Sequence, residues 1–293
     1  MATRLEINKT YKLFINGQFP RTESGRYEKV LNAKGDFLAN ACLGSRKDLR
    51  NAVEAARKAQ LGWGKRPAFN ISQIVYRLAE MFEARKTEFV NILESQGKSA
   101  SQAKAEIENS IDLLVYYAGW ADKYQQVFSS VNPVSGNFFN FSVYEPTGVV
   151  VSMANETASF FELLKIIIPI IIGGNTTVVV LDTNFAPSAI SFAEVIATSD
   201  FPSGVINIIT AKTEELIDHA SKHMDVNAFA GVGLNKTQIE LTEANAFNNV
   251  KRVKNYSVQD LNEEPNPYLI LDFQEVKTTW HPIDEPIAGA NSY

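Results

Sequence analysis

The sequence predicts an α/β protein built on a doubly wound parallel sheet, and three observations lead to this prediction. From Gly148 onward, short β-branched blocks alternate with helical patterns. The block "TTVVVL" (176–181) has no polar alternation, which is typical of a strand covered on both faces. The chain has 293 residues, 45% of them hydrophobic, which is enough for a substantial core.

Short strands and then three helices are expected before this sheet. Residues 1–45 contain "FINGQF" and "NAKGDF", which are typical of short strands joined by turns. Apolar residues then recur at helical spacing in three segments, of which the first starts at a Ser45 cap: 45–63, 71–82 and 107–118. The loop "SSVNPVSGN" leads to "FFNFSVY", whose alternating aromatic residues predict a strand.

Five strands separated by helices make up the predicted sheet. The predicted strands are "GVVVSM", "TTVVVL", "GVINIIT", "DVNAFAG" and "KRVKNY". Parallel strands require right-handed crossovers, and ligands of such sheets bind beyond the carboxyl ends of the strands. These ends are expected near Ala154, Leu181, Thr210 and Gly231.

The most apolar stretch, "KIIIPIIIGGNTTVVVL" (165–181), is predicted to be a buried helix followed by a buried strand. Pro169 interrupts it, and Gly173, Gly174 and Asn175 end its first half. The uninterrupted apolar runs are therefore much shorter than the roughly 20 residues that a membrane span needs. We expect no membrane-spanning segment.

The segment "PYLILDFQEVKTTWHPIDEP" carries a strong strand signal with no helix after it. Strands are expected at Tyr268–Leu271 and Val276–Trp280. Such a ribbon has no evident place in a finished α/β unit, so we expect it to pair with another strand edge.

Charge and cysteine content limit the partners and the compartment. The net charge is −5, which favours neither nucleic acid nor an anionic membrane as a partner. Cys42 is the single cysteine, so an internal disulfide is impossible, and a reducing compartment fits this usage. The first residues lack the apolar core of a signal peptide, and we expect a cytoplasmic protein.

Three sets of side chains could carry chemistry, and each also has a structural interpretation. Cys42 is better explained as a small buried thiol than as a nucleophile. His219 and His223 are spaced to share a helix face, yet a metal needs a further ligand; a polar last turn is the better explanation, and we expect no metal site. Three acidic pairs are expected in solvated turns: Glu214/Glu215, Glu263/Glu264 and Asp284/Glu285.

Six motifs, in the same order along the chain, resemble the aldehyde dehydrogenase superfamily. They are "EAARKAQLGW", "YYAGWADK", "EPTGVV", "GGNTTVVV", "FPSGVINIIT" and "VKRV", and together they cover about residues 11 to 254. The resemblance implies a Rossmann-like, NAD(P)-dependent fold with N-terminal helices and a small antiparallel oligomerisation ribbon. It also implies oxidation of aldehydes to acids through a cysteine thiohemiacetal.

The residues at the family's first two cofactor positions depart from its pattern. The Pro-Trp-Asn positions, whose Asn helps to hold the oxyanion, are occupied by Asn155, Glu156 and Thr157. The Lys that grips the adenosine ribose is replaced by Val180 or Leu181. The Glu three residues further on falls at Thr183 or Asn184.

The remaining positions implied by the resemblance are also changed. The Gly-x-Gly after the third strand is Ala211, Lys212 and Thr213, and Thr-Gly-Ser becomes Ala230, Gly231 and Val232. The general-base Glu falls near Tyr256. We therefore expect no catalytic residues, NAD or NADP binding that is weak or lost, and a vestigial crevice formed by Met153, Ala154, Asn155, Glu156, Val180, Leu181, Gly231 and Val232.

The largest departure follows Val253, where the family continues into a catalytic domain that carries the nucleophilic Cys. Here the chain reaches "FQEVKTTWHP" within about 20 residues, and this segment resembles the family's C-terminal ribbon strand. The expected organisation is a cofactor-type domain (1–131 and 147–262), an oligomerisation ribbon (132–146 and 265–282) and a tail (283–293).

Two functional hypotheses follow from the resemblance and its departures. The first is a non-catalytic homologue that acts as an oligomerising structural or regulatory subunit. It would form a homo-oligomer, or a hetero-oligomer with a full-length aldehyde dehydrogenase, through 137–144 and 268–280. The alternative is the NAD(P)-binding half of a split aldehyde oxidoreductase whose Cys lies on another chain. A weaker third possibility is a nucleotide or metabolite sensor.

Overall fold

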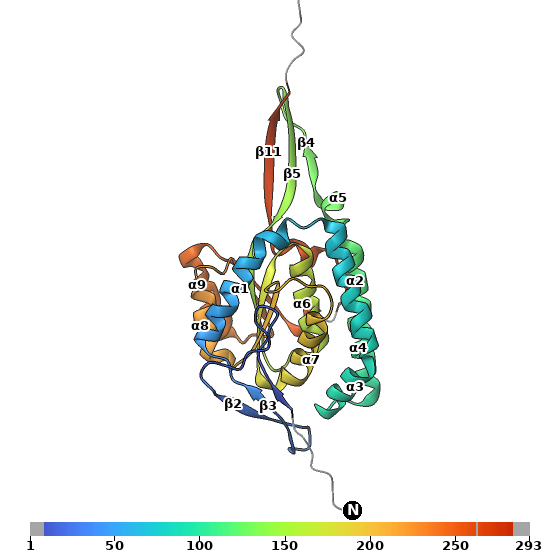
Figure 1. The fold of residues 1–293 in the computed structure, drawn as a ribbon. Coiled ribbons are helices and arrows are strands. Elements are labelled where there is room, and N and C mark those ends of the chain that lie inside the picture. Colours follow the sequence, from blue (N-terminus) through green and yellow to red (C-terminus); the bar gives the residue numbers. More distant parts are fainter. Residues whose placement is uncertain (1–8, 262, 284–293) are drawn as a thin grey trace, which may run out of the picture.

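The computed structural model describes residues 9–261 and 263–283, and its centre is a five-stranded parallel sheet (Figure 1). The strand order is β10-β9-β6-β7-β8, and every neighbouring pair is parallel. The strands are β6 (Val149–Ala154), β7 (Thr176–Leu181), β8 (Ile206–Thr210), β9 (Ala228–Val232) and β10 (Arg252–Tyr256). The chain enters this sheet at its central strand β6 and adds β7 and β8 on one side. It then crosses to the other side of β6, where it adds β9 and β10. This arrangement confirms the doubly wound fold.

Helices cover both faces of the sheet, because neighbouring residues of each strand point to opposite sides. Val149, Val151 and Val178 face α1 (Arg46–Gly64) and α8 (Thr213–Lys222) in one cluster of buried apolar residues. The opposite face packs against α6 (Phe160–Ile172) and α7 (Ala186–Ala197). The last crossover helix is α9 (Lys236–Ala246), which contacts α8 and β10.

The apolar stretch 165–181 runs through the centre of this core. It forms the end of α6, a turn, and all of β7, and every one of its residues is buried. Pro169 lies inside α6, and the helix begins with a complete capping box between Ser159 and Glu162. None of the helices in the described residues is long and apolar enough to cross a membrane.

Within the described residues, five helices precede the sheet where the periodicity predicts three: α1, α2 (Ala68–Ala84), α3 (Lys86–Ser95), α4 (Ala100–Trp120) and α5 (Tyr124–Phe128). Of these, α2, α3 and α4 pack outside α6 and α7, whereas α1 lies on the opposite face of the sheet with α8. The prediction missed α3 because this short helix buries only Phe89 and Leu93, too few to give a periodic signal. It missed α5 because that helix has five residues and buries only Tyr124.

A small three-stranded sheet precedes α1, as the turn motifs predict. Its order is β1-β3-β2, with β1 (Thr10–Tyr11), β2 (Tyr27–Leu31) and β3 (Phe37–Cys42). The N-terminal segment also bridges the edge of the main sheet, since Phe14 pairs with Ile208. This pairing places β2 close to the carboxyl end of the parallel strands (Figure 1).

A second three-stranded sheet projects from the body and is called the ribbon below (Figure 1). It contains β4 (Ser130–Asn132), β5 (Phe138–Pro146) and β11 (Gln274–Pro282), in the order β11-β5-β4 and all antiparallel. The predicted strand at Val276–Trp280 thus pairs with another strand of the same chain. The segment expected to be a plain loop contributes β4.

The strand expected at Tyr268–Leu271 is wrong, because these residues form the short helix α11. Pro267 occupies the N-cap position, and the side chain of Asn266 accepts a hydrogen bond from the Tyr268 backbone N–H. Ile270 then enters the core. Local capping and burial outweigh the aromatic and β-branched composition that suggested a strand.

Two smaller expectations are also corrected. His223 follows the last residue of α8 in an extended conformation, so His219 and His223 do not share a helix face. Glu214 and Glu215 lie in the first turn of α8 rather than in a free turn. Asp284 and Glu285 lie outside the described residues.

Candidate functional site

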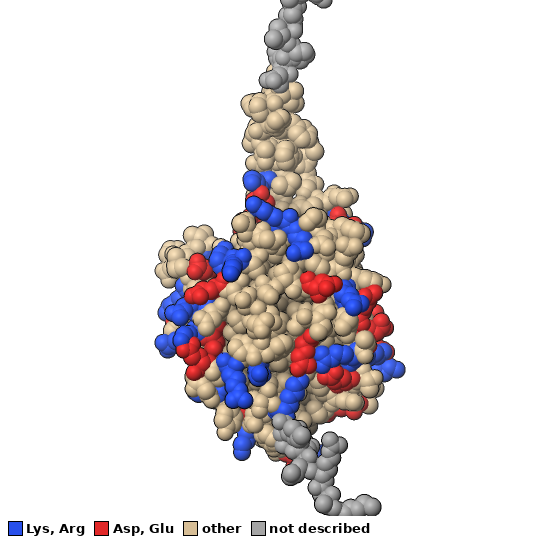
Figure 2. All heavy atoms as spheres, viewed as in Figure 1, with Lys and Arg blue, Asp and Glu red and all other residues tan. Residues whose placement is uncertain are grey.

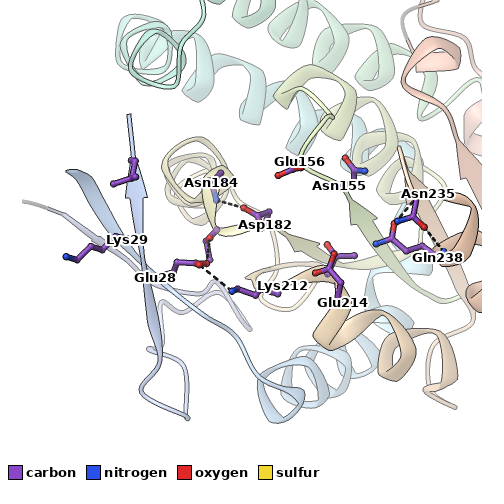
Figure 3. A pocket seen from close by; sticks show the side chains of 13 residues that line it. Glu28, Lys29, Asn155, Glu156, Asp182, Asn184, Lys212, Glu214, Asn235 and Gln238 are labelled. Carbon is purple, nitrogen blue, oxygen red and sulfur yellow. Dashed lines mark hydrogen bonds and ion pairs between the residues drawn. The ribbon is translucent and has the colours of Figure 1, made fainter. Parts of the chain in front are cut away.

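A crevice with a volume of about 540 Å³ lies at the carboxyl ends of the parallel strands (Figure 3). Asn155 and Glu156 reach it directly after β6, and Asp182 and the short 3₁₀ helix Thr183–Phe185 follow β7. The start of α8 and the start of α9 close its sides, and β2 forms the opposite wall. This is the position at which doubly wound sheets bind ligands.

Four carboxylates and two ammonium groups line this crevice. The carboxylates belong to Glu28, Glu156, Asp182 and Glu214, and the ammonium groups belong to Lys29 and Lys212. They come from β2, the ends of β6 and β7 and the start of α8, so no short sequence motif contains all of them. The lining is therefore negative overall.

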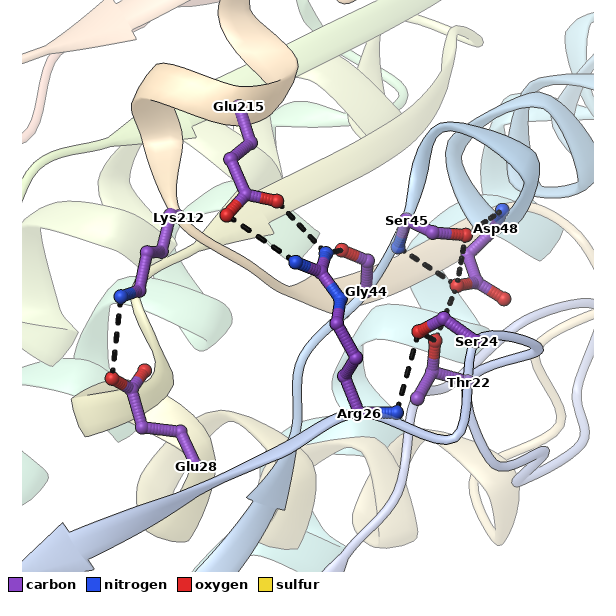
Figure 4. Close-up of polar contacts among 9 residues, drawn as sticks. All are labelled: Thr22, Ser24, Arg26, Glu28, Gly44, Ser45, Asp48, Lys212 and Glu215. Atoms are coloured by element: carbon purple, nitrogen blue, oxygen red, sulfur yellow. Dashed lines mark hydrogen bonds and ion pairs between the residues drawn. The ribbon is translucent and has the colours of Figure 1, made fainter.

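Polar contacts fasten β2 to the carboxyl end of the main sheet (Figure 4). The Glu28 carboxylate accepts a 2.8 Å hydrogen bond from the Thr183 hydroxyl and lies 3.5 Å from Nζ of Lys212. Arg26 donates to both carboxylate oxygens of Glu215, at 3.4 and 2.8 Å. The bonds from Arg26 hold the pKa of the Glu215 carboxyl below its usual value. These contacts hold one wall of the crevice in place.

Only part of the crevice expected from the resemblance is exposed in the structure. Asn155 and Glu156 line the pocket. The other expected residues are buried inside the sheet, where their side chains pack: Met153, Ala154, Val180, Leu181 and Val232, together with the buried glycine Gly231. Sequence reasoning missed Glu28, Lys29 and Asp182 as lining residues, because β2 is distant in sequence and Asp182 falls between the two compared positions, at 180–181 and 183–184.

The space above Gly231, the glycine shared with the family's Thr-Gly-Ser, is filled by this chain. A Cβ atom at this position would lie 2.3 Å from Oδ1 of Asn255 and 2.6 Å from Cδ1 of Leu234. Gly231 is thus required by the packing of its neighbours. It does not open a cradle for a pyrophosphate.

A second pocket, of about 450 Å³, adjoins the crevice and shares Glu156 and Asn184 with it. It lies at the start of α6, where the Glu106 carboxylate accepts hydrogen bonds from the backbone N–H groups of Phe160 and Phe161. Lys98 forms an ion pair with the same carboxylate. An internal anion therefore occupies the helix N-terminus, where bound anions are commonly found.

Cys42 and Tyr256, the residues compared above with catalytic groups, lie in packed or hydrogen-bonded positions. Cys42 is buried at the end of β3. Tyr256, near which the family's general base falls, donates to the Asp272 carboxylate. Among the residues that the structure describes, no group of three or more His, Cys, Asp or Glu side chains is placed to hold a metal ion.

The ribbon is a second candidate site, of a different kind. From Tyr124 to Tyr144 the sequence contains no charged residue. Large apolar side chains are exposed along the ribbon: Val131, Phe138, Phe139, Val276 and Trp280. Figure 2 shows the projecting part almost free of charge, above a body whose surface carries both signs.

The doubly wound sheet with a crevice at its carboxyl edge defines a Rossmann-like type of α/β protein. The sequence profile of the Aldehyde dehydrogenase family matches residues 19–255. This chain belongs to that family. The match ends one residue before the end of β10, so it includes the whole parallel sheet.

Curated relatives are similar over most of this chain. The "Aldehyde dehydrogenase, cytosolic 1" of Macroscelides proboscideus is 34% identical over 258 residues, which are 86% of this chain and 50% of that protein. The "D-glyceraldehyde dehydrogenase (NADP(+))" of Thermoplasma acidophilum is 28% identical and covers 83% of this chain and 49% of its own length. The chain thus spans about half the length of the curated relatives it matches.

Solved structures show the same relationship. An NAD-dependent aldehyde dehydrogenase from Sinorhizobium meliloti superposes with a TM-score of 0.79 at 25% identity, covering 85% of this chain and 50% of that one. The NAD⁺ complex of an aldehyde dehydrogenase from Bacillus cereus gives a TM-score of 0.79 at 23% identity, covering 85% and 51%. The second likeness supports the fold alone.

Proposed function

We propose that this chain is a subunit of an aldehyde dehydrogenase-family assembly that associates through its ribbon and does not itself oxidise aldehydes. The observation that carries the proposal is the ribbon surface, which is aromatic and exposed and whose charged residues are Glu145, Glu275 and Lys277. Exposed apolar patches of this kind mark interaction sites in soluble proteins. The partner is a second copy of this chain or a full-length aldehyde dehydrogenase. The cytosolic relatives support a cytoplasmic location.

Both faces of the ribbon expose apolar side chains. Residues directly opposite each other in an antiparallel sheet share a face, so the register places Val131, Phe139, Phe141 and Val143 on one side, together with Lys277. The opposite side carries Phe138, Val276 and Trp280 beside hydrogen-bonded polar groups, including the pairs Asn132–Asn140 and Ser142–Thr278. We expect association to cover the side that contains Phe139.

The chemistry within these residues supports the absence of turnover. Cys42 is the single cysteine of the sequence and is buried at the end of β3. The chain passes from the end of β10 at Tyr256 to the start of β11 at Gln274 without the catalytic domain that the resemblance implies between them. The negative crevice and the filled space above Gly231 support NAD(P) binding that is weak or lost.

Light scattering during size exclusion tests the association. The protomer has a mass of 32.5 kDa, and we expect a larger mass for the chain alone or together with a full-length relative. Phe139→Glu should return the mass to that of the protomer, because it places a charge in an apolar interface. Leu61→Glu, at an exposed apolar position on α1, is the control and should leave the assembly intact.

Two outcomes would count against the proposal. One is that the unmodified chain elutes with the mass of a single protomer when it is alone and also when it is mixed with the full-length relative. The other is an assembly that survives Phe139→Glu. If the assembly with a full-length relative gains aldehyde oxidation that depends on dinucleotide bound to this chain, the split-oxidoreductase alternative would replace the proposal.

A further inference from the structure

We infer that the crevice excludes phosphate-bearing ligands, dinucleotides included, because carboxylates line it and Lys212, one of its two ammonium groups, is already paired with Glu28 of the same chain. The inference rests on the cofactor part of the proposed function and deepens it by naming the residues responsible. Its test is separate from that of the ribbon.

Three carboxylates provide the negative field. Glu156, Asp182 and Glu214 follow three different strands and point toward the same crevice (Figure 3). Glu156 and Glu214 are exposed, and the ion pairs found among residues 9–261 and 263–283 include neither of them. Asp182 accepts the backbone N–H of Asn184, which holds its carboxylate at the lining.

The lysine nearest the strand ends is already neutralised. Lys212 lies 3.5 Å from the Glu28 carboxylate, which β2 carries across the crevice and which Thr183 fixes by a 2.8 Å hydrogen bond. A phosphate would have to displace an anion that belongs to the same chain and is already positioned. Such a competitor costs no association entropy, so it has the advantage over a free ligand.

Backbone donors at the starts of α9 and α6 are also occupied, and the start of α8, which has no side-chain cap, carries the acidic residues Glu214 and Glu215 in its first turn. In α9, the Asn235 side chain accepts from the Gln238 N–H, and the Gln238 side chain accepts from the Asn235 N–H. In α6, the first two N–H groups donate to Glu106, and Glu162 N–H donates to Ser159. These are amide groups that an incoming anion commonly uses at a helix start.

The exclusion has a salt dependence of its own. An anion bound by a basic site loses affinity as salt rises, because salt screens the attraction. Here salt screens a repulsion between the crevice carboxylates and the ligand phosphates. Any residual dinucleotide affinity should therefore stay constant or increase when NaCl is raised from about 0.05 to 0.5 M.

The test is a titration of the full chain with NAD⁺, and separately with inorganic pyrophosphate, followed by calorimetry and ligand-observed NMR. The triple variant Glu156→Gln, Asp182→Asn, Glu214→Gln keeps the size of each side chain. It should bind NAD⁺ about a hundredfold tighter, at about fivefold per carboxylate, the ratio given by water-screened repulsion at contact distance. The control variant Glu83→Gln, Asp112→Asn, Glu243→Gln makes the same change in net charge at exposed positions outside the crevice. It should not change the affinity.

The possible outcomes distinguish failure of this inference from failure of the proposed function. Micromolar NAD⁺ binding by the unmodified chain, weakening with salt, would overturn both the inference and the cofactor part of the proposed function. Weak binding that is equally weak in the triple variant would overturn the inference alone. An equal gain in the control variant would also overturn it, since net charge and not the crevice would then be the cause.

Discussion

The phenol oxygen of Tyr256 donates a 2.8 Å hydrogen bond to Oδ2 of Asp272, and Nζ of Lys254 lies 2.8 Å from Oδ1 of the same carboxylate. These contacts connect the last strand of the parallel sheet to the segment that enters the ribbon. Burial, together with the nearby Asp272 charge, raises the pKa of Tyr256 well above its usual value, so the phenol stays protonated at neutral pH. Near the expected position of the family's general base, this chain therefore has a structural hydrogen bond.

Tyr256→Phe removes that hydrogen bond and leaves Asp272 with Lys254. Because hydrogen bonds to charged groups stabilise a fold more than neutral ones, we expect a loss of about 1.5–3 kcal/mol in the free energy of unfolding. Urea denaturation measures this loss. Tyr76→Phe, at an exposed tyrosine on α2, is the control and should have almost no effect. Equal stability of both variants would show that the Tyr256–Asp272 bond contributes nothing.

Gly231→Ala tests whether this glycine serves packing. The new Cβ would lie 2.3 Å from Oδ1 of Asn255, so the neighbours must move, and we expect a destabilisation of about 1–3 kcal/mol. Combining it with Asn255→Ala removes the nearest obstacle and should restore part of that stability. A stable Gly231→Ala single variant would contradict the packing role.

Lys165→Met tests the anchoring of the segment that follows β10. The buried Lys165 donates to the backbone carbonyls of Leu261 and Glu263, and burial lowers its pKa. Loss of the ammonium leaves both carbonyls without this donor, so we expect a cost of about 1–3 kcal/mol. Hydrogen exchange should increase around Leu261 more than in β7. Uniform exchange across both regions would contradict a local anchor.

Val250→Asn should stabilise the protein. Val250 is 94% exposed and has a φ of +53°, a left-handed conformation that is strained for a β-branched residue. Asn adopts this conformation more readily, so we expect a gain of about 1 kcal/mol in the free energy of unfolding. Val127→Asn, at an exposed helical valine, is the control, since Val and Asn have similar helix propensities. A loss of stability in Val250→Asn would contradict the strain.

Lys251 predicts a pH dependence with a definite sign. Its ammonium donates to the carbonyls of His223 and Val226, and burial lowers its pKa to about 8, from 10.5 in the unfolded chain. Between these values the unfolded chain binds more protons than the folded chain, so the Lys251 contribution to stability rises with pH. The unfolding free energy of the unmodified chain minus that of Lys251→Met should therefore increase from about pH 7.5 to 10. A constant or falling difference would contradict the lowered pKa.

Most of the central fold could be predicted because its signals are local and strong. The helix and strand within 165–181 are continuously apolar, and the glycine pair between them ends the helix unambiguously. The strand predicted at 268–271 was wrong because its local signal is misleading. Its composition favours a strand, whereas Pro267, Asn266 and the burial of Ile270 make it a helix.

The crevice could be predicted in position but not in composition. The parallel topology places it at the carboxyl ends of the strands, and this identified Asn155 and Glu156. Glu28 reaches the crevice from a separate sheet, and the pairing of Phe14 with Ile208 that brings this sheet near has no sequence signal. The neutralisation of Lys212 depends on that same tertiary contact.

The ribbon also has a consequence for the order of events during protein synthesis. Its central strand pairs with β11 across a long interval, since Ser142 bonds to Thr278, 136 positions further along the chain. While the ribosome extends the chain, β5 emerges well before its neighbour and has only the short β4 beside it. The complete surface exists only after residues 274–282 have left the exit tunnel. Assembly through the ribbon is therefore expected to follow translation of this segment. Nascent chains on the same messenger RNA should not associate through ribbons that still lack β11.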